Sequence, residues 1–114
     1  MKRIFNAFLY SLSGLSLAIR DEAAFRQLLM ISVAAMVAVI FLPISAAAKV
    51  IIVFAHLVSL AVELLNTGIE SAIDRISEER HPLSKKAKDC GSAAQLVMMV
   101  GLLLVWVSAL THII

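Results

Sequence analysis

Three long apolar segments dominate the sequence and restrict the folds it can adopt. They span about residues 23–42, 47–67 and 92–112, and each is long enough to cross a bilayer of about 30 Å as a helix. Of the 114 residues, 61% are hydrophobic, and the mean hydropathy is +0.97, far above that of soluble domains. The sequence therefore predicts an all-α membrane protein with three transmembrane helices in a single domain.

The N-terminal segment follows a different pattern. In about residues 3–19, apolar side chains recur at helical spacing with serines between them, which indicates an amphipathic helix at the membrane surface. A cleaved signal peptide is the alternative, because Lys2 and Arg3 precede an apolar run. However, polar residues interrupt that run, and charged residues 20–22 follow where a signal peptide requires small ones. We therefore expect a surface helix.

Basic residues lie almost entirely on one side of the predicted spans. Of the ten Lys and Arg residues, only Lys49 falls in the turn on the other side. The positive-inside rule then predicts a cytosolic N-terminus, an external C-terminus and a cytosolic loop over about residues 78–89. The net charge of +2 is small, and no basic run is interleaved with aromatic residues. Nucleic acid is therefore not an expected partner.

The second apolar segment carries acidic side chains on one helical face. Glu63 and Glu70 are two turns apart at about 3.6 residues per turn. Within about a quarter-turn of the same line lie Asn66, Thr67 and Asp74. A charged side chain at the bilayer centre costs about 2.5–3.5 kcal/mol. The acidic face is therefore expected to meet protein, water, metal or substrate, and it is the candidate functional site.

The acidic face permits two kinds of function. Together with Glu22 at the cytosolic start of the first span, its carboxylates can hold Mg²⁺ if the helices pack together. A metal with a neighbouring base suits phosphoryl transfer, although the familiar Gly-rich nucleotide-binding loops are absent from the sequence. Small cation-coupled transporters also carry a membrane-embedded glutamate, and some acidic residues only pair with arginine across helices. The pattern alone leaves enzyme and transporter open.

Three blocks of sequence stand out when they are taken together. They are Glu22-Ala23-Ala24-Phe25-Arg26-Gln27, Glu63-Leu64-Leu65-Asn66-Thr67-Gly68-Ile69-Glu70 with Asp74-Arg75, and Ala87-Lys88-Asp89 followed by Gly91-Ser92-Ala93-Ala94. In this order the blocks resemble the bacterial integral-membrane diacylglycerol kinases over nearly the whole chain. Undecaprenol kinases share the Glu-Asn-Glu core and are the alternative within the fold. The first and third blocks favour the diacylglycerol branch.

The resemblance implies a homotrimeric helical bundle in the bacterial inner membrane. In that family, a surface helix and three spans per subunit build active sites at subunit interfaces. The implied activity is phosphorylation of diacylglycerol to phosphatidate, with ATP as phosphoryl donor and Mg²⁺ as cofactor. The expected partners are therefore the membrane lipid, the nucleotide and further copies of the same chain.

Residue roles follow from the resemblance position by position. It implies that Glu63 is the catalytic base for the lipid hydroxyl with Asn66 beside it, and that Glu22 and Glu70 hold the metal. The implied ATP-binding positions are Arg3, Tyr10, Glu22, Glu70, Glu79, His81, Lys88 and Asp89. The implied lipid-binding positions are Arg3, Ser11, Ala24, Arg26, Lys49, Glu63 and Ser92. His56, two turns before Glu63 on the same face, lies outside the resemblance and is predicted to be a packed histidine.

Overall fold

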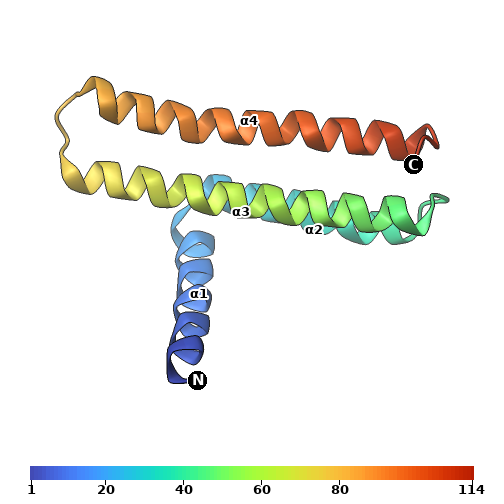
Figure 1. Ribbon diagram of the computed structural model, residues 1–114, viewed down its shortest axis with the longest axis horizontal. Helices are drawn as coiled ribbons and strands as arrows, with labels where there is room; N and C mark the ends of the chain where they lie inside the picture. Colours follow the sequence, from blue (N-terminus) through green and yellow to red (C-terminus); the bar gives the residue numbers. More distant parts are fainter.

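The computed structural model describes residues 1–114 and consists of four helices. They are α1 (Lys2–Asp21), α2 (Ala23–Ile40), α3 (Ala46–Ile76) and α4 (Pro82–Leu110). Figure 1 shows α2, α3 and α4 running alongside one another, while α1 projects steeply away from them. Helices α2, α3 and α4 are each long and apolar enough to cross a membrane. The predicted all-α fold, with an N-terminal helix and three candidate spans, is confirmed.

Glu22 forms the elbow between α1 and α2. Its backbone is extended, with φ −114° and ψ 106°, and it caps the end of α1 and the start of α2. The Arg26 side chain reaches back from α2, and its Nη1 donates to the carbonyls of Ile19 at 2.9 Å and Arg20 at 2.8 Å. Carbonyls in the last turn of a helix have no partner within that helix. Arg26 therefore supplies their hydrogen bonds and holds the elbow.

The turn between α2 and α3 lies at the opposite end of the bundle from this elbow. Ser45 caps α3, because its Oγ accepts a hydrogen bond from the Ala48 amide at 3.0 Å. Lys49 Nζ donates to the Ile40 carbonyl at 2.7 Å and so caps the end of α2. These short-range contacts close a tight connection and make α2 and α3 antiparallel.

Helix α4 begins earlier than the sequence pattern suggests. The segment over about residues 78–89, predicted as a loop, is helical from Pro82 onward. Proline is favoured in the first helical turn, because its missing N–H would have no partner there. His81 caps this helix, since its Nδ1 accepts from the Leu83 amide at 3.1 Å. The irregular connection between α3 and α4 is therefore short and ends at a side-chain cap.

Few residues of a single chain are buried. The hydrophobic core cluster lies near the α2–α3 turn and contains Val39, Ala48, Ile52 and Ala109, none more than 1% exposed. Only 13 of the 114 residues are buried, and many large apolar side chains are exposed on all four helices. Lipid can cover such faces without cost, as can a neighbouring protein surface.

His56 joins the three spans through a buried polar network. Trp106 Nε1 donates to His56 Nε2 at 3.1 Å, and His56 Nδ1 lies 3.2 Å from Ser32 Oγ. Because tryptophan can only donate, Nε2 must be the unprotonated nitrogen, and Nδ1 therefore carries the proton toward Ser32. His56 is 5% exposed, so the prediction of a packed histidine is confirmed.

Candidate active site

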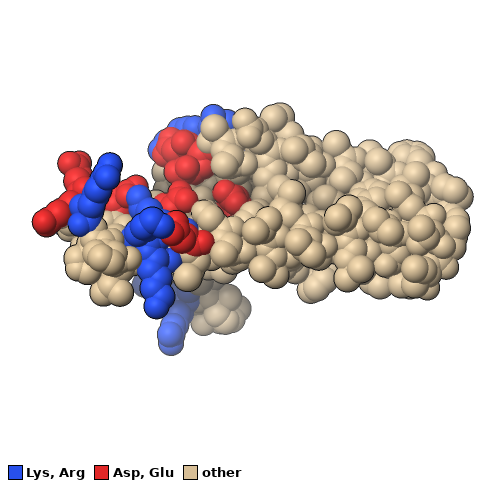
Figure 2. Space-filling model, turned by 90° about the horizontal axis from the view of Figure 1, so that it is seen from above, with Lys and Arg blue, Asp and Glu red and all other residues tan.

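Charged side chains gather at one end of the molecule. Figure 2 shows Lys, Arg, Asp and Glu at the end that carries the α1–α2 elbow and the α3–α4 connection, while the rest of the visible surface is uncharged. Along α3, the carboxylates of the acidic face follow the mostly apolar residues 50–62 and precede the α3–α4 connection. The structure thus brings the candidate site to one predicted membrane boundary.

Glu63 lies half-buried on α3 with one carboxylate oxygen bound to α4. Gln95 Nε2 donates to Glu63 Oε2 at 3.2 Å and to the Ser59 carbonyl at 3.4 Å. Glu63 Oε1 accepts no hydrogen bond within the chain. This oxygen is therefore available as a proton acceptor.

Asn66 packs between Glu63 and Glu70 at the interface of α3 with α4. It is 8% exposed, and its Nδ2 donates to Glu70 Oε1 at 3.3 Å. It lies against Gly91 of α4: a Cβ at Gly91 would come within 3.1 Å of Asn66 Cγ and still closer to Oδ1. A side chain at position 91 would therefore displace the Asn66 amide, which approaches the backbone of α4 closely here.

Three carboxylates share this end of the bundle without a basic partner. Glu22 and Glu70 both lie near enough to Glu63 for their charges to act on it. None of the three ion pairs of the chain involves these residues, because Asp21, Asp74 and Asp89 take the nearby cations. Uncompensated carboxylates at a membrane boundary are a donor set that a divalent cation would neutralise.

The carboxylates suit a Mg²⁺ ion that is shared with a nucleotide better than a metal ion that is held by protein side chains alone. No group of three or more His, Cys, Asp or Glu side chains in the chain is arranged to hold a metal ion. Mg²⁺ is usually held by one or two carboxylates together with substrate phosphates and waters. Glu22 and Glu70 therefore suit a metal that arrives with a nucleotide.

A cavity of about 640 Å³ lies beside the α3–α4 connection. Its lining includes Asp74, Glu79, His81, Lys85, Lys88 and Asp89. Lys88 Nζ donates to Asp74 Oδ1 at 2.6 Å, and Lys85 pairs with Asp89 one turn away. Lys88 is also near enough to Glu70 to interact with its charge. The cavity thus adjoins the acidic face and presents ammonium groups beside it.

A groove of about 620 Å³ separates α1 from α3. Ser11, Ala18 and Glu22 line one side, and Thr67 and Gly68 line the other. Small and apolar side chains make up much of its wall. This groove opens next to the elbow, so it reaches the carboxylates from the side of the surface helix.

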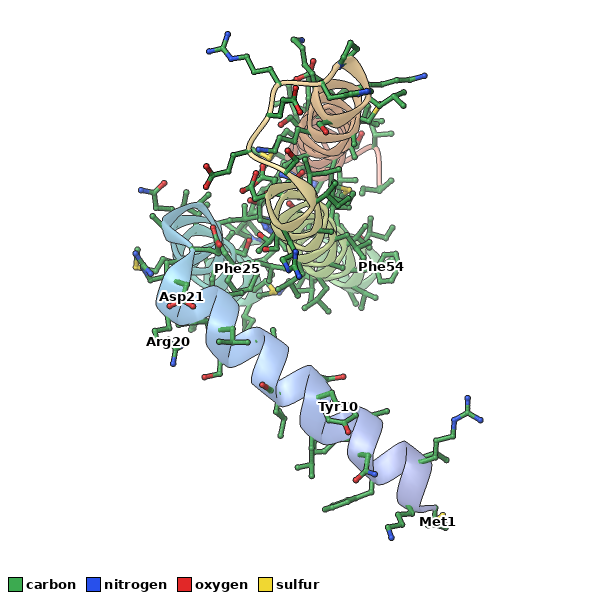
Figure 3. All side chains as sticks on the ribbon, turned by 90° about the vertical axis from the view of Figure 1, so that its left-hand side faces the viewer. Met1, Tyr10, Arg20, Asp21, Phe25 and Phe54 are labelled. Carbon is green, nitrogen blue, oxygen red and sulfur yellow. The ribbon has the colours of Figure 1, made fainter.

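Three predicted site residues lie apart from these features. Arg3 and Tyr10 lie on the distal half of α1, and Figure 3 shows Tyr10 well away from the bundle. Lys49 is 14 residues before Glu63 on α3, or about 21 Å along the helix. Ala24 and Ser92 are exposed on α2 and α4. One chain therefore does not assemble the whole predicted site.

Sequence reasoning missed Gln95 and the contact made by Gly91. Gln95 is the one carboxamide in the third apolar segment, and a carboxamide in an apolar segment is itself a signal of a polar contact. In the sequence, Gly91 stands out only as part of the third block. Its contact with Asn66 depends on how α4 lies against α3, which helical spacing within one segment does not encode.

The fold defines a small multi-pass membrane protein with three candidate spans, and its candidate carboxylates lie on and beside α3. The chain belongs to the prokaryotic diacylglycerol kinase family, whose model matches residues 9–110. The family predicted from the three sequence blocks is thereby confirmed.

Several curated relatives carry the name diacylglycerol kinase. The protein of Pseudomonas aeruginosa strain PAO1 is 46% identical over 110 residues, covering 96% of this chain and 89% of the relative. The protein of Helicobacter pylori strain 26695 is 39% identical over 105 residues, covering 92% of this chain and 82% of the relative. The Escherichia coli K12 protein is 39% identical over 104 residues, covering 91% and 85%.

Proposed function

We propose that this diacylglycerol kinase transfers the γ-phosphoryl group of ATP to the free hydroxyl of diacylglycerol, giving phosphatidate and ADP. The observation that carries the proposal is the set of three carboxylates without basic partners, Glu22, Glu63 and Glu70, beside a cavity that presents ammonium groups. The predicted orientation puts this end at the cytosolic face of the bacterial inner membrane, where ATP is available.

Glu63 is the proposed general base. On α3 it follows the mostly apolar residues 50–62 and precedes the acidic residues Glu70 and Asp74, a position that suits a hydroxyl carried on a membrane lipid. As the proton of that hydroxyl passes to Glu63 Oε1, the hydroxyl oxygen forms its bond to the γ-phosphorus, and the bond from phosphorus to the ADP oxygen breaks. Asn66 is proposed to assist by keeping Glu70 apart from Glu63 through its own hydrogen bond to Glu70.

Glu22 and Glu70 are the proposed metal ligands. Mg²⁺ bound there together with ATP would supply positive charge to the phosphate oxygens during transfer. The amide of Asn66 already orients Glu70 through a hydrogen bond. Glu22 lies at the elbow and forms no ion pair. These two side chains therefore bind and orient, whereas Glu63 exchanges the proton.

The cavity beside the α3–α4 connection is the proposed nucleotide site. Lys88, released from or shared with Asp74, would pair with phosphate oxygens close to Glu70. The proposed contacts with the rest of the nucleotide come from Glu79, His81 and Asp89, which line the same cavity. The ammonium groups and the metal would share the neutralisation of the triphosphate, which is the main requirement of phosphoryl transfer.

The groove between α1 and α3 is the proposed lipid approach. Its small side chains leave room for an acyl chain, and Ser11 offers a hydroxyl at its wall. Ala24 and Ser92 are proposed as further lipid contacts, as the family resemblance implies. Arg26 and Lys49 already cap helix ends, so lipid contact is for them a second role at most.

A homotrimer is the proposed functional unit. Arg3 and Tyr10 lie on the projecting part of α1, and few residues of the single chain are buried. A neighbouring subunit placed against these apolar faces would bring its own α1 toward the acidic face and would cover the exposed helices. The site would then be built from two chains.

A lipid phosphorylation assay tests the proposed function. The purified protein in mixed micelles receives Mg²⁺ and labelled ATP with diacylglycerol, with undecaprenol, or with neither. We expect labelled phosphatidate as the main product. Faster phosphorylation of undecaprenol would overturn the lipid assignment, and no transfer to either lipid would overturn the function.

Replacement of the base tests the role of Glu63. The Glu63→Gln variant keeps the shape of the side chain but cannot accept the proton, so we expect turnover to fall by about 10² to 10⁴. ATP affinity and thermal stability are measured on the same samples and should stay near those of the parent protein. A folded Glu63→Gln protein with near-normal turnover would exclude Glu63 as the base.

A further inference from the structure

Gln95 is the only side chain of α4 that donates a hydrogen bond to the proposed base. The bond from Gln95 Nε2 to Glu63 Oε2 is 3.2 Å long and joins residues 32 positions apart in the chain. The same Nε2 group donates to the Ser59 carbonyl at 3.4 Å, one turn before Glu63 on α3. The carboxamide is therefore held by two acceptors on the facing helix.

The direction of the carboxamide is determined by its surroundings. A reversed amide would place Oε1 against the Glu63 carboxylate and the Ser59 carbonyl, and three acceptor oxygens repel one another. Only the orientation with Nε2 toward Glu63 makes hydrogen bonds. Gln95 therefore presents an N–H to one chosen carboxylate oxygen.

This orientation leaves the oxygen of the Gln95 carboxamide without a hydrogen bond. Gln95 Oε1 is buried and accepts no hydrogen bond within the chain. An unpaired buried carbonyl is unfavourable, and an apolar side chain of the same length would avoid this cost. Packing alone therefore does not account for a glutamine at this position, whereas its contact with Glu63 does.

We propose that Gln95 is a positioning residue for the base of this kinase. By holding Glu63 Oε2 against α4, it fixes the rotation of the carboxylate and directs Oε1 toward the lipid hydroxyl. Gln95 exchanges no proton: the hydroxyl proton passes to Glu63, and the phosphoryl group passes to the hydroxyl oxygen. The inference rests on the proposed role of Glu63.

The pairing also separates the roles of Glu63 and Glu70 on α3. Glu63 is bound to the carboxamide of Gln95, and Glu70 is bound to the carboxamide of Asn66. Each carboxylate thus has its own amide donor. Without Gln95, Glu63 could turn toward the metal-binding carboxylates and share their cation, which would remove it from the hydroxyl.

Gln95→Met is the direct test, because methionine matches the length of glutamine and cannot donate. We expect the kcat for diacylglycerol to fall about tenfold, as for loss of a hydrogen bond to a charged group. The KM for ATP should stay within about twofold, because the nucleotide cavity is untouched. The midpoint of thermal unfolding should be unchanged or higher, since the unpaired carbonyl is removed.

Two comparisons make the result decisive. Val97→Met puts the same side chain at an exposed position of α4 and should leave kcat unchanged. In a Glu63→Gln background, Gln95→Met should cause no further loss, because a positioning residue acts only through the base. A Gln95→Met protein with unchanged kcat, or one that loses kcat and stability together, would overturn the inference. Failure of the parent protein to phosphorylate diacylglycerol would instead overturn the proposed function.

Discussion

At the scale of single residues, neighbouring acidic side chains differ in whether a basic group already neutralises them. Asp21 accepts from Arg20 Nε at 3.0 Å, and this hydrogen bond lowers the pKa of the Asp21 carboxyl. Glu22, the next residue, forms no ion pair, because Arg26 is taken up by backbone carbonyls of α1. Position around the elbow therefore decides which of two adjacent carboxylates remains free to bind a cation.

The Mg²⁺ dependence of activity tests this difference. We expect Glu22→Gln and Glu70→Gln each to raise the Mg²⁺ concentration for half-maximal turnover by about tenfold or more, because each removes a proposed ligand. Asp21→Asn is the matched control, and its midpoint should stay near that of the parent. The measurement is turnover at saturating ATP over a Mg²⁺ titration. An unchanged midpoint in both Glu variants would exclude this metal site.

Gly91 tests how the helix interface positions Asn66. Alanine at this position would push the Asn66 amide from its place and break its hydrogen bond to Glu70. We expect Gly91→Ala to lower turnover about tenfold, while the helix itself should gain up to about 1 kcal/mol from the better helix former. The measurements are kcat and thermal unfolding in the same detergent.

Gly101→Ala is the control on the same helix. A Cβ at Gly101 meets no atom within 4 Å, so this substitution should keep full activity and carry the same gain in helix propensity. Equal activity of the two alanine variants would mean that the close approach of Asn66 to α4 has no part in catalysis.

At the scale of helices, the polar network of His56 connects all three spans. We expect Trp106→Phe to lower the free energy of unfolding by about 0.6 to 1.7 kcal/mol, because it removes the donor to His56 Nε2 inside the bundle. A double-mutant cycle with His56→Leu isolates the pairwise contribution. Additive effects of the two substitutions would show that the hydrogen bond contributes nothing to stability.

The helices themselves were predictable, because apolar length and periodicity act within one segment. A helix predicted over about residues 3–19 is found over Lys2–Asp21, and the first candidate span begins at Ala23 as expected. The early start of α4 depends on a cap from His81 and on Pro82, which are local signals that the long charged segment obscured. Contacts that depend on how helices lie against each other, such as Gln95 with Glu63, could not be read from spacing.

For the candidate site, too, the sequence predicts what lies on one helix but not the contacts between helices or subunits. Glu63, Asn66 and Glu70 share a face because they share one helix, and the elbow brings Glu22 near enough to Glu63 for its charge to act there. Arg3 and Tyr10 were expected at the nucleotide, but within one chain they lie far from it on α1. Their predicted role requires a second subunit. The pattern of residues in one sequence does not give the arrangement of two subunits.

At the scale of the whole molecule, the open shape of the single chain leads to a prediction about shared active sites. The acidic face belongs to α3, whereas Arg3 and Tyr10 lie on a helix that projects away from it (Figures 1 and 3). If the projecting α1 of one subunit completes the site of the next, then each site uses Glu63 from one chain and Arg3 from another.

Mixing two inactive variants tests this arrangement. Glu63→Gln and Arg3→Ala should each be nearly inactive as pure proteins, because every site lacks one of the two groups. When the two proteins are unfolded together and reassembled in detergent, some mixed trimers contain a site with both native residues, so turnover should reappear. The control mixture combines Glu63→Gln with Asn66→Ala, two variants of the same helix face, which cannot complement because both residues come from one chain. Two different affinity tags identify the mixed oligomers. If these oligomers remain as inactive as the pure variants, the site is not shared between subunits.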